Sequence, residues 1–176
     1  GAEFETYGIS LEQQFATGTY LGITGEILNS EVERTRGAFD IFPLALPFGV
    51  PSGLREHLDY TERALLFTFN QLIGKEWALG VRYRLSDVDY TYDFAQVSAT
   101  TAVVDFQPHQ ELESLLHEIN LYTIYNHRSG FFARLEANWY AQNNVGYVPA
   151  APGDEFWQFN AFAGFRFPRR QAEIMV

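Results

Sequence analysis

Residues 131–142 read FFARLEANWYAQ, and their side chains alternate between an apolar set and a largely polar set. In an extended strand one face would carry Phe131, Ala133, Leu135, Ala137, Trp139 and Ala141. The other face would carry Phe132, Arg134, Glu136, Asn138, Tyr140 and Gln142. A period of two residues predicts a β-strand with one apolar face. The stretch is also long enough to cross a bilayer, since a tilted transmembrane strand needs about 9 to 11 residues.

The same alternation recurs in residues 4–15, 19–27, 63–73, 77–86, 115–126, 156–167 and 171–176. Short turns, such as Ala16-Thr17-Gly18 and Gly74-Lys75, alternate along the chain with long connections at 34–63, 87–113 and 143–155. Short periplasmic turns and long external loops are typical of outer-membrane barrels. The sequence therefore predicts an all-β fold: one domain, 1–176, forming an antiparallel up-and-down transmembrane β-barrel of about eight strands.

Composition excludes other classes of protein. No run of about 18 apolar residues occurs, which excludes a helical membrane span. The formal net charge is -10 and Lys75 is the one lysine, so a clustered basic surface for nucleic acid is missing. Without cysteine the chain has no disulfide, thiolate metal site or thiol nucleophile.

Two sets of residues are candidate functional positions. Aromatic residues flank the short turns and would form a membrane-interface girdle: Phe15, Tyr20, Trp77, Tyr125, Phe131, Phe165 and Phe167. Charged residues of both signs lie on the polar faces in mid-strand and would face the lumen: Glu12, Glu26, Arg82, Arg84, Arg134, Glu136, Arg166 and Glu173. Together they favour a pore or transporter with a polar lumen.

A soluble, secreted or periplasmic lipocalin-like barrel that binds an apolar ligand is the alternative, because such barrels are also up-and-down. In that fold, large rings would lie inside and in mid-strand rather than beside the turns. An intact membrane segment would need detergent for extraction, whereas the soluble barrel would not.

No combination of residues predicts an enzyme, a metal site or a cofactor. His57, His109, His117 and His127 are scattered without metal-ligand spacing. Ser114, His117 and Glu118 are neighbours that point to alternate sides of a strand.

The long connections offer weaker candidates. Asp87, Asp89 and Asp93 lack the glycine and terminal glutamate of a calcium loop, so a solvated acidic loop is preferred. The connection at 34–63, with Pro43, Pro47 and Pro51, is interpreted as an external loop. Packing on itself is preferred to folding over the mouth of the barrel.

Two segments carry a family resemblance: residues 54–86, LREHLDYTERALLFTFNQLIGKEWALGVRYRLS, and residues 11–35, LEQQFATGTYLGITGEILNSEVERT. They resemble the C-terminal barrel of large outer-membrane proteins that carry tetratricopeptide repeats upstream, a barrel similar to that of TonB-dependent receptors. The resemblance covers most of the chain and rests on strand and turn sequence. It implies a Gram-negative outer-membrane location, a porin-like or transport role, surrounding outer-membrane lipid, and tetratricopeptide repeats upstream as a partner.

We also expect an incomplete barrel wall. Residues 171–176 offer about half of the 9 to 11 residues that a spanning strand needs. Residues 1–176 include no secretion leader, no plug domain with its TonB box, and no final strand that ends in an aromatic residue. The remainder of the same barrel is therefore an expected partner.

Overall fold

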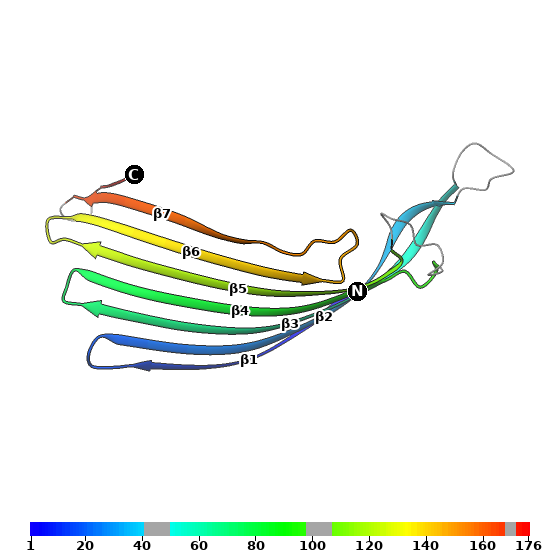
Figure 1. The fold of residues 1–176 in the computed structure, drawn as a ribbon, viewed down its shortest axis with the longest axis horizontal. Coiled ribbons are helices and arrows are strands. Elements are labelled where there is room, and N and C mark those ends of the chain that lie inside the picture. Colours follow the sequence, from blue (N-terminus) through cyan, green and yellow to red (C-terminus); the bar gives the residue numbers. More distant parts are fainter. Residues whose placement is uncertain (41–49, 98–106, 168–171) are drawn as a thin grey trace.

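The computed structural model describes residues 1–40, 50–97, 107–167 and 172–176, and its regular elements are all β-strands (Figure 1). The strands are β1 (Ala2–Gln14), β2 (Thr19–Asp40), β3 (Val50–Ile73), β4 (Trp77–Asp93), β5 (His109–Asn126), β6 (Phe131–Val145), β7 (Glu155–Arg166) and β8 (Glu173–Met175).

Each strand pairs antiparallel with the next, in one sheet of eight strands with the order β1 to β8. The prediction of an all-β, antiparallel, up-and-down fold is confirmed. The sheet is bowed and open: in the described part of the chain, β1 pairs with β2 alone and β8 with β7 alone (Figure 1).

The short turns lie together at one end of the sheet, as predicted, and Figure 1 shows them at the left. The turns after β1, β3 and β5 each contain a glycine with positive φ: Gly18 at 76°, Gly74 at 61° and Gly130 at 104°. This region of φ is strained for residues with a Cβ atom. The turn predicted at Pro168-Arg169-Arg170 lies outside the described residues.

Gly130 gives a first testable prediction. A Cβ atom there would lie 2.1 Å from the backbone oxygen of Arg166, so the backbone of one of the two segments would have to move. Gly130→Ala should therefore lower the free energy of unfolding by about 1 to 2 kcal/mol, through left-handed strain and displacement of β7. The free energy of unfolding in urea would measure the effect. Gly37→Ala is the control, because its Cβ would meet nothing within 4 Å; equal stability of the two variants would contradict the prediction.

Two predicted long connections are wrong in their described parts, because the strands continue through them. β2 and β3 extend to Asp40 and from Val50, and β4 and β5 extend to Asp93 and from His109. The hydrogen-bonded ladder continues there, but the apolar side chains change to the even-numbered face, as in residues 87–93, DVDYTYD. The apolar face of the neighbouring strand segment therefore does not continue into these residues. Pro51 lies near the start of β3, opposite Phe39. Residues 41–49, including Pro43 and Pro47, are outside the described residues.

Candidate functional site

The register divides the sheet into two faces. Residues that pair across strands share a face, and every pairing from β1 to β7 joins residues of the same parity, as in the row Glu12, Gly22, Thr68, Arg82, Asn120, Asn138 and Gln158. Even-numbered residues therefore form one face of β1 to β7 and odd-numbered residues the other. We call them the polar face and the apolar face.

The apolar face carries a band of exposed apolar side chains across the sheet. Leu135 is 55% exposed and Phe159 is 73% exposed. In β4 the band runs from Trp77 through Leu79, Val81, Tyr83 and Leu85. Beyond this level the same face becomes charged, with the carboxylates Glu3, Glu5, Glu31, Glu33, Asp59, Asp87, Asp89, Asp93, Glu111 and Glu113. The band thus has a sharp boundary at the end opposite the short turns.

The girdle aromatics lie at the turn end of the apolar face, with one exception. The ring centroids of Trp77 and Tyr125 are 4.6 Å apart, and those of Tyr125 and Phe131 are 6.3 Å apart. Phe165 and Phe167 also contact each other, at 5.4 Å, and Phe15 has the same parity. Tyr20 is even-numbered and lies on the polar face, where its hydroxyl accepts a hydrogen bond from Gln14 at 3.1 Å. Its position beside a turn was not enough to assign its face.

All eight predicted charged residues lie on the polar face, since β8 pairs Glu173 with Arg166. Arg84 pairs with Glu62 at 2.9 Å, Arg166 with Glu173 at 3.0 Å, and Arg134 with its strand neighbour Glu136. Glu62 was missed from the sequence because it falls in a stretch interpreted as a loop. Extending the predicted strand 63–73 by one residue toward the N-terminus would have included it.

The most buried side chains also favour the polar face. The buried strand residues Glu56, Ser86, Leu112 and Phe132 are all even-numbered. Side chains crowd on the inner side of a curved sheet, so this distribution is that of a concave polar face and a convex apolar face.

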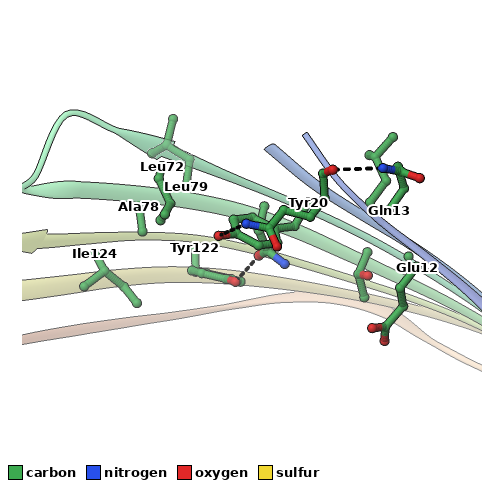
Figure 2. A pocket seen from close by; sticks show the side chains of 13 residues that line it. Glu12, Gln13, Tyr20, Leu72, Ala78, Leu79, Tyr122 and Ile124 are labelled. Carbon is green, nitrogen blue, oxygen red and sulfur yellow. Dashed lines mark hydrogen bonds between the residues drawn. The ribbon is translucent and has the colours of Figure 1, made fainter. Parts of the chain in front are cut away.

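A hollow of about 740 Å³ lies on the turn side of the polar face (Figure 2). Its walls include Glu12, Tyr20 and Tyr122, and Leu72, Ala78 and Ile124 lie toward the turn end. The hollow exists partly because two positions in its wall are glycine. A Cβ on Gly80 would lie 2.1 Å from the ring of Tyr122, and a Cβ on Gly22 would lie 2.5 Å from the Thr68 hydroxyl. Tyr122 therefore lies across β4 and donates its hydroxyl hydrogen to Asn70 on β3.

At the opposite end, β2 and β3 project beyond their neighbours as a two-stranded arm, residues 33–40 and 50–56 (Figure 1). Its base holds Glu56, which is 3% exposed and accepts hydrogen bonds from the Nε atoms of Arg34 and of Arg36 at 2.7 Å. The Arg36 guanidinium also lies 5.9 Å from the centre of the Phe94 ring. This cluster was not predicted, since its residues fall in the presumed loop.

The Arg34 guanidinium, followed by Arg36, holds the pKa of the Glu56 carboxyl below its ordinary value of 4.5. A lowered folded-state pKa means that ionised Glu56 stabilises the arm at pH above 4.5 and that this contribution disappears as the pH falls through the folded-state pKa. We expect acidification below pH 4.5 to increase the mobility of a spin label attached at residue 52 of β3. Glu56→Gln should remove most of this pH dependence; a variant with an unchanged profile would contradict the assignment.

The other candidate chemistry does not assemble. Asp87 and Asp89 both bind the Nη1 atom of Arg63, at 3.2 and 2.9 Å, and lie on strands. Ser114 donates to Asn144, whereas His117 lies on the opposite face with Nδ1 2.9 Å from the Tyr83 hydroxyl.

The remaining histidines, His57, His109 and His127, each have their own separate contacts. Nε2 of His57 is 3.0 Å from Asp59 and 3.8 Å from Glu31, on the exposed charged part of the apolar face. His109 contacts Asp93 and Glu111 at 3.5 Å, and His127 contacts Ser129 within its turn. His57 and His109 thus lie beside carboxylates, and His127 bonds within its own turn.

Comparisons of the chain with protein-family models, with curated proteins and with solved structures gave no match. The family resemblance seen in the sequence therefore stays a prediction. Among the described residues there is no helix with the length and hydropathy to cross a membrane.

Proposed function

We propose that this chain is a wall of an outer-membrane β-barrel, whose polar face lines a water-filled pore or transport path and whose apolar face contacts lipid. The observation that carries the proposal is the exposed apolar band together with its two boundaries. Aromatic rings mark its turn end, and carboxylates begin abruptly at its other end. A surface that exposes this much contiguous apolar area belongs against lipid or protein rather than water.

The height of the band agrees with a bilayer. In β4 it extends from Trp77 to Leu85, and Asp87 follows on the same face. A tilted strand crosses the hydrocarbon core with roughly 9 to 11 residues. The aromatic residues at its turn end correspond to one headgroup level, where amphipathic rings are enriched.

The soluble alternative is less well supported. A lipocalin-like barrel places its aliphatic side chains on the concave inner face. Here the even-numbered, polar face contains the buried side chains, whereas odd-numbered Leu135, Phe159 and Ile9 are exposed.

The open edges imply further strands in the membrane. In the described part of the chain the outer edge of β1 has no strand partner, and the last residues bond to β7 only from Ala163 to Phe167. An unsatisfied N–H or C=O group in lipid costs several kcal/mol. We therefore propose that strands from the rest of the same polypeptide complete the barrel.

Membrane extraction tests the proposal. We expect the full-length chain, expressed with its own export route, to stay in the membrane pellet after alkaline carbonate and to be released by detergent. Purified vesicles containing it should float in a density gradient. Recovery in the soluble periplasmic or secreted fraction without detergent would contradict the membrane assignment and favour the lipocalin-like alternative.

A further inference from the structure

We propose that the hollow on the polar face binds a neutral, hydroxyl-rich ring solute, that is, a saccharide. This rests on the proposed function, in which the polar face lines the lumen, and it names the class of solute that this face selects.

The first argument is the hydrogen-bonding chemistry of the hollow. Neutral groups that both donate and accept dominate its polar walls: Gln14, Tyr20, Thr68, Asn70 and Tyr122. The same two rows continue across the sheet with more side-chain amides: Asn120, Asn138, Gln158 and Asn160. Amides and hydroxyls offer donors and acceptors together, which matches a sugar hydroxyl, itself a donor and an acceptor.

The second argument is the electrostatics. Of the four arginines at this depth, Arg84, Arg134 and Arg166 are each paired with a carboxylate. Arg82 has no ion pair among the described residues. An anionic solute would therefore meet one available guanidinium while passing Glu12, Glu26 and Glu118, so the surface disfavours anions.

The third argument is the presence of aromatic surfaces. Tyr122 is held across Gly80 by its hydrogen bond to Asn70, so its ring is fixed in orientation at the wall of the hollow. Tyr20 is similarly tied to Gln14. Farther along the polar face, Tyr60, Tyr90 and Tyr92 form a chain of rings with centroids 6.5 and 6.2 Å apart. Rigid rings flanked by hydrogen-bonding groups suit solutes with an apolar ring face and a polar rim.

The volume is consistent with this class. The hollow of about 740 Å³ lies within the range of roughly 300 to 1,000 Å³ for small-molecule sites. It is open toward the interior of the curved sheet, as a site on a transport path must be.

Binding to the full-length chain in lipid nanodiscs tests the inference. The probes are maltotriose, cellotriose, xylotriose and mannotriose. Saturation-transfer NMR detects their binding, and spermidine and citrate serve as charged competitors. We expect at least one trisaccharide to bind and neither charged solute to displace it. The double variant Thr68→Val with Asn70→Leu should weaken binding by about tenfold, because it removes two hydrogen-bonding groups.

The matched control makes the same two changes on the opposite face, Thr61→Val on β3 with Asn29→Leu on the adjacent strand β2, whose side chains hydrogen-bond each other at 3.1 Å. We expect binding within about twofold of the parent chain. No bound trisaccharide, equal effects of the two double variants, or displacement by spermidine would each overturn the inference. A chain that inserts into lipid but binds no trisaccharide would refute this inference alone, whereas a chain that fails to insert would refute the proposed function as well.

Discussion

Replacing Leu135 by arginine is expected to destabilise the membrane-inserted chain by about 2 to 4 kcal/mol, the cost of a guanidinium on the lipid face near the bilayer midplane. Leu135 lies on the apolar face of β6 and is 55% exposed. Its cross-strand neighbours on this face are Thr123 on β5 and Ala161 on β7, and Leu79 on β4 lies one strand farther along the same row. The measurement is the free energy of unfolding from lipid vesicles in guanidinium chloride.

Asn138→Arg is the matched control, because it introduces the same side chain three residues along the same strand but on the polar face. There it would lie in the row of Asn120 and Gln158 and face water. We expect a change below about 1 kcal/mol, as for a solvated surface substitution. Equal destabilisation by the two arginines would contradict the assignment of the faces.

Removing the Glu56 carboxylate should loosen the arm. Glu56→Ala leaves Arg34 and Arg36 side by side without the acceptor they share. A hydrogen bond to a charged group contributes about 1.5 to 3 kcal/mol, and losing a buried partner costs more. Because both arginines are about half exposed, water compensates them in part. We expect the free energy of local opening of the arm to fall by about 2 to 3 kcal/mol.

Hydrogen exchange of the amides in residues 50–56 at pH 7 would measure this opening. Glu33→Ala is the control, since Glu33 is an exposed carboxylate on the same arm and on the other face. Faster exchange that is confined to Glu56→Ala supports the cluster. Unchanged exchange in that variant would show that the arm is held by its backbone ladder alone.

Alternation was sufficient to predict the sheet where the band crosses it. In β6 the odd residues from Phe131 to Ala141 are all apolar, so both the strand and its faces could be assigned from the sequence. Beyond the band this signal fails for a physical reason. Glu31 and Glu33 alternate there with Val32, so the apolar residue has moved to the other face while the ladder continues.

The sites depended on cross-strand register, which one sequence does not contain. Glu56 and Arg34 are far apart in the chain and become neighbours because β2 pairs with β3 in one particular register. The same holds for Tyr122, whose ring occupies the space above Gly80 on the adjacent strand. A glycine in mid-strand signals a close approach, but the residue that approaches cannot be named without the register.

The central claim, that odd-numbered residues contact lipid and even-numbered residues contact water, can be tested along β6. The chain has no cysteine, so single cysteines can carry a nitroxide label at each position from 131 to 142. Collision rates with oxygen, which concentrates in lipid, and with a water-soluble nickel chelate would be compared in bilayers. We predict that oxygen accessibility peaks at 133, 135, 137 and 139 and that chelate accessibility peaks at 134, 136 and 138. Loss of the two-residue period, or chelate access to residue 135 equal to that at residue 138, would contradict the account.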